Sequence, residues 1–159
     1  MKRSAVTSIE LERFLPYRLS VLTNLVSSAI AAEYHQRFGL GIPEWRVIAV
    51  LARNAGLSAA EVAAYTRMDA VAVSRAVMRL ARAGRIRRSV APDDRRRSVL
   101  RLSPAGRAVY RRVAPLALRY ERGLLECLGD GETTALDTII AKLTSRAHAL
   151  ATDGLDAGR

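Results

Sequence analysis

The sequence predicts a mainly α-helical protein with a small β-hairpin wing. Three features predict this fold class. Apolar residues recur at helical spacing in six segments, two short β-prone runs enclose a polar tip, and glycines and prolines separate these segments. The 159 residues suit one domain with a substantial core. We therefore expect a single domain over residues 1–159.

The first helix is expected over residues 10–38, where apolar side chains recur every three or four positions. Pro16 should kink this helix or delay its true start, because proline lacks the N–H that a helix interior needs. A glycine-containing break follows, and Pro43 is well placed in the first turn of a helix that runs to about residue 54. Three large apolar residues of this second helix are its candidates for burial: Trp45, Ile48 and Leu51.

The next two helices are short and closely spaced. Ser58 and Glu61 have the pattern of a capping box, which begins a helix that ends near residue 65. After a three-residue turn, another helix is expected over residues 69–83, capped by either Thr66 or Asp69. The inward stripe of this helix consists of three residues at helical spacing: Val73, Val77 and Leu80.

A β-hairpin and two further helices complete the chain. The strands are expected over residues 86–90 and 99–102, around a tip with a proline, two aspartates and three arginines. A Ser-Pro pair begins a long helix over residues 103–128, in spite of an internal proline. The last helix is expected over residues 132–150, with fraying from Ala151 onward.

Positive charge is concentrated in the middle of the sequence. The net charge is +11, and 24 of the 26 basic residues are arginines. Thirteen arginines lie between Arg75 and Arg112, where only two acidic residues occur, so this stretch carries the whole surplus. Guanidinium groups hold phosphate through paired hydrogen bonds, so this concentration favours a nucleic acid, either DNA or RNA, over an anionic membrane surface as the partner.

Two short helices, a tight turn and a basic hairpin are the parts of a winged helix-turn-helix, with its core expected over residues 43–102. The second helix would enter the major groove, where Arg75 could reach a guanine edge and Ser74 a base or a phosphate. Alanine and valine there could only touch thymine methyl groups. The predicted DNA-binding residues are Ser58, Asp69, Ala70, Val71, Ser74, Arg75, Arg79, Arg88, Arg95, Arg96 and Arg97.

The hairpin tip is a separate indication of DNA binding. Three consecutive arginines would repel one another without an anionic partner, and a narrow minor groove attracts inserted arginine. We expect one of them in the minor groove and the others on phosphates. Arg107, Arg111 and Arg112 are either a solvated helix face or further phosphate contacts.

Four segments carry a resemblance to a known family: residues 57–63, 73–88, 94–96 and 102–106. They resemble the MarR family of bacterial regulators, whose wing has an aspartate, any residue and an arginine ahead of a Leu-Thr-x-x-Gly helix start. The resemblance implies that Asp94 braces the wing through a salt bridge and that Arg96 enters the minor groove. It also implies an obligate homodimer, with dimerisation helices over residues 10–38 and 103–150. Residues 70–72 depart from the pattern, since many relatives carry polar or basic residues there.

The same resemblance implies a small-molecule pocket between the dimerisation helices and the DNA-binding lobe, often for aromatic acids. An aromatic wall with arginine suits an aromatic carboxylate. Five residues lie in the regions that would line this pocket: Arg18, Tyr34, His35, Trp45 and Arg46. Trp45 is otherwise a core residue, and neither histidine has a second residue at metal-ligand spacing.

Catalytic and metal-binding patterns are missing from the sequence, including nucleophile elbows, phosphate loops and zinc spacings. We therefore expect no enzyme activity, no metal and no cofactor apart from an aromatic acid effector. No apolar run reaches the roughly 18 residues of a membrane span, and the basic start lacks the apolar region of a secretory signal. The single cysteine, Cys127, is expected to be a small buried residue in a cytoplasmic protein.

The sequence thus predicts a sequence-specific, ligand-responsive repressor that binds a pseudo-palindromic operator as a homodimer. The alanine-rich recognition helix suggests an alternative, a non-specific architectural DNA-binding protein. An RNA-binding module is disfavoured because the chain has only two Phe, five Tyr and one Trp to serve as stacking platforms.

Overall fold

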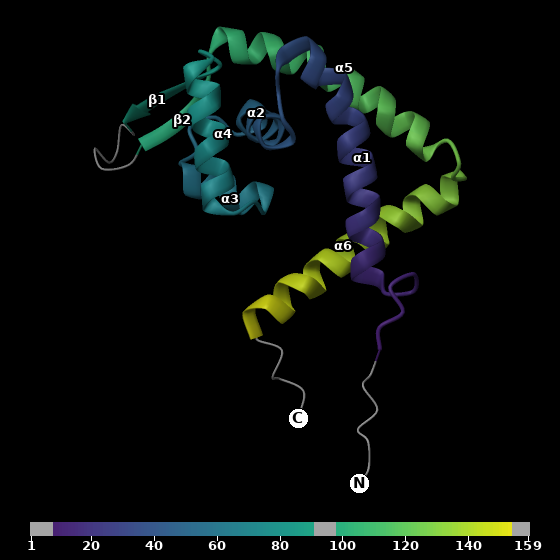
Figure 1. The fold of residues 1–159 in the computed structure, drawn as a ribbon. Coiled ribbons are helices and arrows are strands. Elements are labelled where there is room, and N and C mark those ends of the chain that lie inside the picture. The colour runs from purple at the N-terminus through teal and green to yellow at the C-terminus, as the bar shows by residue number, and fades with distance from the viewer. Residues whose placement is uncertain (1–7, 91–97, 154–159) are drawn as a thin grey trace. The chain divides into compact units, whose positions relative to one another are not determined.

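The computed structural model describes residues 8–90 and 98–153, which form helices and one two-stranded hairpin (Figure 1). The predicted fold class and order of elements are confirmed. The elements are α1 (Leu15–Phe38), α2 (Ile42–Arg53), α3 (Ala59–Thr66), α4 (Ala70–Arg82), β1 (Ile86–Val90), β2 (Ser98–Leu102), α5 (Pro104–Leu125) and α6 (Asp130–Asp153). The chain divides into two compact units, residues 1–117 and 118–159, and α5 belongs to both.

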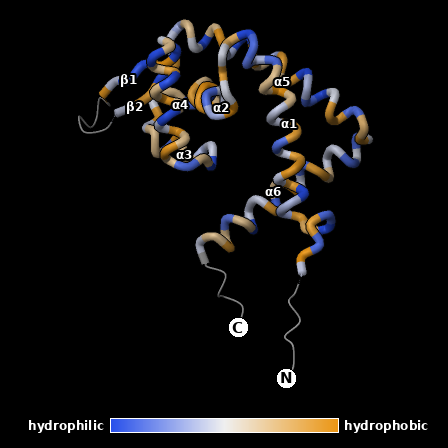
Figure 2. The backbone as a smooth tube through the Cα atoms, viewed as in Figure 1, coloured by the Kyte–Doolittle hydropathy of each residue, from blue (hydrophilic) through white to orange (hydrophobic). Residues whose placement is uncertain are grey.

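The hydrophobic core of the first unit lies among α2, α3, α4 and the hairpin. Figure 2 shows hydrophobic residues on each of these elements. α2 contacts α3, α4 and β2, while α4 also contacts β1. Because every one of these elements contributes to the same core, their relative orientation is fixed by packing. The largest fully buried side chains are Tyr34, Leu40, Ile48, Leu51, Leu80, Leu100, Val47, Val62, Val73, Val77 and Val113.

The hairpin is antiparallel, and its register pairs Ile86 with Leu102 and Arg87 with Arg101. Side chains alternate across a strand, so the Ile86 and Leu102 pair packs into the core while the two arginines lie on the opposite face. The loop before α3 forms an isolated antiparallel bridge with β2, in which the Leu100 N–H donates to the Leu57 carbonyl at 2.7 Å. This contact joins the wing to the start of the helix-turn-helix.

The first helix begins later than the sequence pattern predicts. We expect a start at residue 10, but α1 begins at Leu15, and Pro16 lies in its first turn. Proline is tolerated there because the first N–H groups of a helix have no intrahelical partner. Of the two alternatives for Pro16, a kink or a delayed start, the structure has the delayed start.

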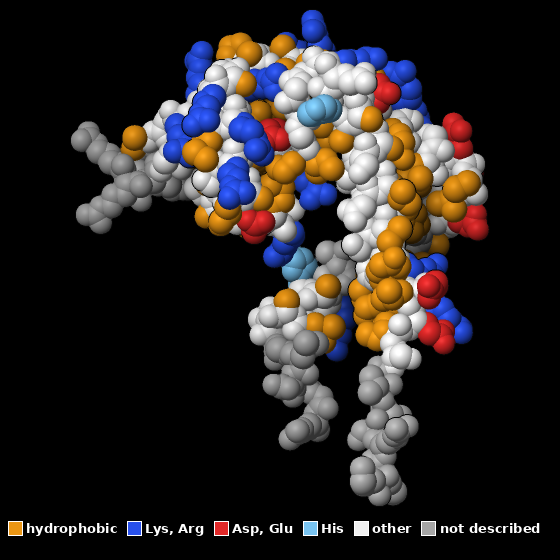
Figure 3. Space-filling view, viewed as in Figure 1, with side chains coloured by type: hydrophobic (Ala, Val, Ile, Leu, Met, Phe, Trp, Pro, Cys, Tyr) orange, Lys and Arg blue, Asp and Glu red, His pale blue; other side chains and the backbone are white. Residues whose placement is uncertain are grey.

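Most of α1 is exposed in the single chain, and Tyr34 is its one fully buried residue. Figure 3 shows apolar side chains gathered along this helix. The exposed large apolar residues of α1 and the segment before it are Ile9, Leu11, Phe14, Leu15, Tyr17, Leu19, Val21, Leu22 and Leu25. A soluble chain rarely leaves so continuous an apolar stripe uncovered, so this face is typical of an interface.

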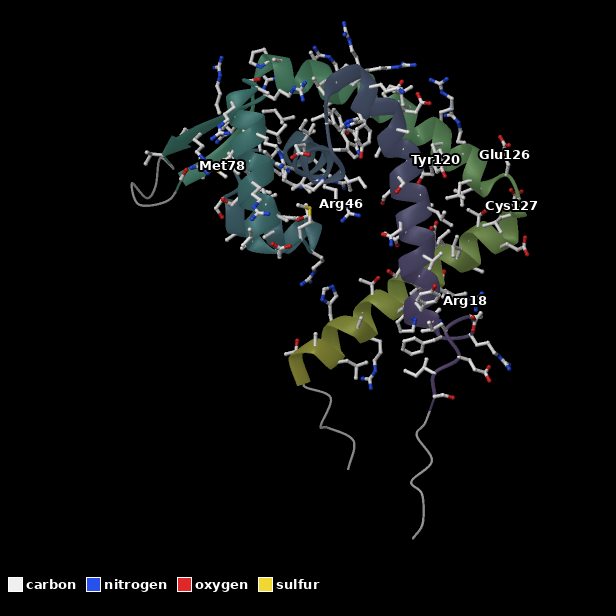
Figure 4. The ribbon with its side chains drawn as sticks, viewed as in Figure 1. Arg18, Arg46, Met78, Tyr120, Glu126 and Cys127 are labelled. Carbon is white, nitrogen blue, oxygen red and sulfur yellow. The ribbon has the colours of Figure 1, made fainter. Side chains whose placement is uncertain are left out.

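The second unit holds the end of α5 and α6, and here three expectations are wrong. α6 begins at Asp130, two residues early, because Glu132 accepts from the Gly129 N–H at 2.9 Å. It continues to Asp153, so the fraying expected from Ala151 does not begin there; Thr152 Oγ1 donates to the His148 carbonyl at 3.0 Å. Cys127, which we expect to be buried, is exposed, because it follows the end of α5 and lies outside the core (Figure 4).

The start of the hairpin is clamped to the start of α5. The Ser103 N–H donates to the Arg85 carbonyl at 2.9 Å, and Ser103 Oγ donates to the Gly84 carbonyl at 2.7 Å. Ser103 Oγ also accepts from the Gly106 N–H at 3.0 Å and so caps α5. A Cβ at Gly106 would lie 2.0 Å from the Arg85 carbonyl oxygen, a distance that no side chain can occupy.

Replacing Gly106 with alanine should therefore destabilise the fold. The new methyl group meets backbone rather than a movable side chain, so we expect a loss of about 2–3 kcal/mol in the free energy of unfolding. Denaturant unfolding at a fixed protein concentration measures this loss.

Gly123, also within α5, provides the matched control. A Cβ there meets nothing within 4 Å, so Gly123→Ala should leave stability unchanged or raise it by up to about 1 kcal/mol. Equal stabilities of the two variants would contradict the clamp.

Candidate nucleic-acid interface

The turn between α3 and α4 is closed by side-chain hydrogen bonds at both ends. Thr66 Oγ1 donates to the Val62 carbonyl at 2.8 Å, at the end of α3. Asp69 Oδ1 accepts from the Ala72 N–H at 2.7 Å and caps α4. The structure thus decides between the two alternatives for this cap in favour of Asp69. Arg67 makes the turn itself by adopting a left-handed conformation, with φ of 54°.

The two faces of α4 differ sharply in burial. The inward stripe of Val73, Val77 and Leu80 is confirmed, and Ala76 completes it; each of the four is 1% exposed or less. The opposite face has two large apolar side chains, Val71 and Met78, which are 59% and 46% exposed. The exposed residues of α4 are Ala70, Val71, Ser74, Arg75, Met78, Arg79, Ala81 and Arg82.

The exposed face of α4 is basic. It carries Arg75, Arg79 and Arg82, and the helix contains no acidic residue. Figure 3 shows basic side chains gathered over this helix. A helix that presents arginines without compensating carboxylates produces a positive potential suited to a polyanion.

Arg79 has a structural partner that sequence reasoning missed. Its Nε–H donates to Oε1 of Glu44, whose side chain is only 7% exposed, and the other carboxylate oxygen accepts from the Gly41 N–H at 2.9 Å. Glu44 therefore caps α2 and holds α4 at the same time. The two residues are 35 positions apart, so only the fold brings them together. The Arg79 side chain remains 59% exposed beyond this ion pair.

Two other predicted DNA-binding residues have capping roles. The capping box at Ser58 and Glu61 is confirmed, with the Glu61 N–H donating to Ser58 Oγ at 3.2 Å and the Ser58 N–H donating to Glu61 Oε2 at 2.7 Å. Asp69 caps α4 as described above. Both side chains lie at the N-termini of the two helices of the helix-turn-helix, where they fix the backbone rather than standing free.

The wing strands carry further arginines, and Arg87, Arg88 and Arg101 are all exposed. Asp94, Arg95, Arg96 and Arg97, which the sequence assigns to the wing tip, lie outside the residues that the structure describes. Their predicted roles stay predictions.

The predicted effector residues gather only in part. Trp45 lies between two tyrosines, with ring centroids 5.9 Å from Tyr34 and 5.9 Å from Tyr110. Tyr110, on α5, is absent from the sequence prediction, since no pattern links it to α2. Burial raises the pKa of the Tyr34 phenol to about 12, an effect that Arg46 opposes and Glu44 reinforces. Arg46 lies on α2, one residue after Trp45 (Figure 4).

His35 and Arg18 lie away from this aromatic cluster. Nδ1 of His35 donates to the Leu40 carbonyl at 3.2 Å, which ties the end of α1 to the loop before α2. Arg18 lies near the beginning of α1 (Figure 4), sixteen residues or about 24 Å of helix before Tyr34. One chain therefore does not bring Arg18 and the cluster into a single site.

Metal-binding clusters of three or more His, Cys, Asp or Glu side chains do not occur within residues 8–90 and 98–153. Across those same residues, none of the helices has the length and apolar character needed to span a membrane.

Comparison with known proteins identifies the fold and shows which family the chain is similar to. A MarR family model matches residues 38–97, which include α2, α3, α4 and β1. The MarR/EmrR family transcriptional regulator of Acinetobacter sp. ADP1 superposes on the chain with a TM-score of 0.82 at 27% identity, covering 89% of this chain and 99% of that one. Over residues 38–97 the chain is similar to the MarR family.

Two further relatives extend the comparison. A transcriptional regulatory protein for the hcr operon of Thauera aromatica is 29% identical over 97 residues, which span 61% of this chain and 58% of that protein. The PcaV transcriptional regulator of Streptomyces coelicolor, solved with its natural ligand, has a TM-score of 0.72 at 24% identity and covers 89% of this chain and 99% of that one, a likeness of fold. MarR family proteins are transcriptional regulators, and this chain shares their winged helix fold.

The raised pKa of Tyr34 makes the stability of this chain sensitive to alkali. The unfolded chain releases the phenolic proton near pH 10 and the folded chain only near 12, so the stabilisation is complete below pH 10 and is lost as pH rises toward 12. Tyr34→Phe has no such proton. The free energy of unfolding of the native chain should therefore fall relative to that of Tyr34→Phe across this interval, and a constant difference would refute the assignment.

Proposed function

We propose that the protein is a ligand-responsive repressor that binds a pseudo-palindromic DNA operator as a homodimer. One observation carries the proposal: α4 buries one apolar face completely and presents a face with three arginines and no carboxylate. A helix of this kind, capped at its N-terminus and preceded by a short helix and tight turn, suits the major groove.

Base readout is assigned to the first turns of α4. Arg75 is exposed and can make two hydrogen bonds to a guanine edge, and Ser74 beside it can bond to a base or a phosphate. Ala70 and Val71 are exposed at the helix start and suit contact with thymine methyl groups. The recognition helix therefore combines one charged reader with apolar contacts.

Phosphate contacts are assigned to Arg79, Arg82 and Arg88, which lie on the outer face of α4 and on β1. At the wing tip, Arg96 is assigned to the minor groove and Arg95 and Arg97 to phosphates, with Asp94 bracing the tip. These contacts give affinity and orientation, while the α4 contacts give sequence preference.

Homodimer formation is supported by the apolar stripe of α1, which one chain leaves exposed. α6 likewise exposes Ile139, Ile140 and Leu143. A two-fold dimer would place two copies of α4 about 34 Å apart, the spacing of successive major grooves on one side of DNA.

An aromatic acid effector is supported by the rings of Tyr34, Trp45 and Tyr110 and by the Arg46 guanidinium, whose charge acts on Tyr34. PcaV is solved with a ligand in the same fold. For release of DNA, the effector must bind the dimer in which the recognition helices no longer match the groove spacing. Each 1.4 kcal/mol of preference for that state weakens DNA binding about tenfold.

Replacing Arg75 with alanine tests the base readout. Loss of a bidentate base contact should cost about 1–3 kcal/mol, or roughly 5- to 150-fold in affinity for a site selected from a random DNA library. Affinity for random duplex should fall much less, because phosphate contacts remain. Fluorescence anisotropy with both duplexes gives the ratio, and Arg53→Ala, at the exposed end of α2, is the charge-matched control. An unchanged ratio in Arg75→Ala contradicts this role.

Replacing Arg96 with alanine tests the wing. Affinity should fall about tenfold or more for selected and random duplex alike, and the slope of log affinity against log salt should decrease by about one. Sedimentation should find the dimer intact.

If the native protein binds selected and random DNA equally well, the architectural alternative replaces specific regulation.

A further inference from the structure

A cavity of about 560 Å³ lies behind the wing, between the end of α2, the two strands and the first turns of α5. None of the side chains lining it comes from α3 or α4, the elements proposed to face DNA. None of the five effector residues predicted from the sequence lines it, although Tyr110, which stacks on Trp45, borders both sites. Among its lining residues, the function proposed above uses only Arg88, for a DNA phosphate, and Tyr110, whose ring it shares with the aromatic cluster.

Five arginines line this cavity, and its lining contains no acidic residue: Arg87, Arg88, Arg101, Arg107 and Arg111. Ion pairs between these arginines and carboxylates are absent from the described part of the chain. A solvated protein surface normally interleaves charges of both signs. Five guanidinium groups around one concavity instead concentrate positive potential in it.

One of the arginines, Arg107, is held in place by a backbone carbonyl, and Arg101 lies against backbone at Gly56. The guanidinium of Arg101 lies over Gly56, with Nη2 3.0 Å from the position of a Cβ there, so a larger residue at Gly56 would displace it. Nη1 of Arg107 donates to the Leu102 carbonyl at 2.7 Å. Arginines positioned in this way lose little conformational entropy when they bind an anion.

The side of the cavity formed by α2 and Tyr110 is mainly apolar. Tyr110 lines the cavity, and its ring stacks on Trp45 at an interplanar angle of 18°, which limits its movement. Leu51, Ala52 and Ala55 complete this side. A fixed aromatic ring beside apolar side chains suits a planar ring, and stacking on aromatic side chains is how proteins commonly hold nucleobases.

A solvated arginine face, the simpler interpretation of Arg107 and Arg111, explains their exposure but not the concavity, the hydrogen bond that holds Arg107 or the stacked ring of Tyr110. We infer that this cavity binds a small phosphorylated ligand with a planar ring, of the nucleotide class. Arg101 and Arg107 grip the phosphates from β2 and α5, and the ring packs against Tyr110. This site goes beyond the proposed function, and its occupancy can be measured without DNA.

Calorimetric titration of the full chain with ATP at about 0.15 M salt tests the inference. ATP should bind saturably, with one molecule per protomer. Adenosine, which lacks the charge, and inorganic triphosphate, which lacks the ring, should each bind at least tenfold more weakly. Triphosphate that binds as tightly as ATP would overturn the inference, because charge alone would then explain the binding, and so would no saturable binding of ATP.

Charge-matched double variants locate the site. Arg101→Gln with Arg107→Gln removes two charge-assisted hydrogen bonds and should weaken ATP binding tenfold or more. Arg75→Gln with Arg82→Gln removes the same charge from α4 and should change ATP affinity by less than twofold. Equal losses in the two double variants would place the phosphate on the DNA-facing surface and overturn the inference.

A second double variant keeps the test valid if the first one misfolds. Arg87→Gln with Arg111→Gln removes cavity charges that make no hydrogen bond or ion pair with described residues. Its thermal unfolding should match that of the native chain, and its ATP affinity should fall at least fivefold. Unchanged ATP affinity in this folded variant would also overturn the inference.

Discussion

The burial of four small and medium apolar side chains on α4 determines where the charge of this protein lies. Val73, Ala76, Val77 and Leu80 fill the core between α2, α3 and the hairpin, so the helix cannot rotate without exposing them. Arg75 and Arg82 must then face outward. The same constraint brings Arg79 to Glu44, whose second oxygen caps α2. Burial of the apolar face therefore holds the arginines of α4 on one surface, although their like charges repel one another.

Much of this arrangement is encoded locally and could be predicted. The capping box at Ser58, the inward stripe of α4 and the Ser-Pro start of α5 each depend on residues within one or two helical turns. Helix ends are harder to predict, because apolar periodicity does not mark the last residues of α6, which continues past Ala151 to Asp153. Residue type alone predicts that Cys127 is buried, whereas its position after α5 makes it exposed.

The features that sequence reasoning missed all join distant segments. Glu44 and Arg79, Trp45 and Tyr110, and Gly56 and Arg101 meet only once the helices have packed. Arg67 is a different case, since a non-glycine residue in the left-handed region gives no sequence signal and is imposed by the turn around it. The arginine-lined cavity is formed by α2, the hairpin and α5 together. In the sequence, its residues have the pattern of a basic helix face and two strands, and nothing in that pattern brings them together.

The contact between Gly106 and the Arg85 carbonyl has a mechanical consequence. Since Ser103 is bonded to both Gly84 and Arg85, the first turn of α5 and the root of β1 move as one piece. A strand of five residues is about 17 Å long, so a tilt of about 10° at its root displaces its far end by about 3 Å, the length of a hydrogen bond. A small shift at Gly106, where only a hydrogen atom fits against the Arg85 carbonyl, would therefore be amplified along the hairpin.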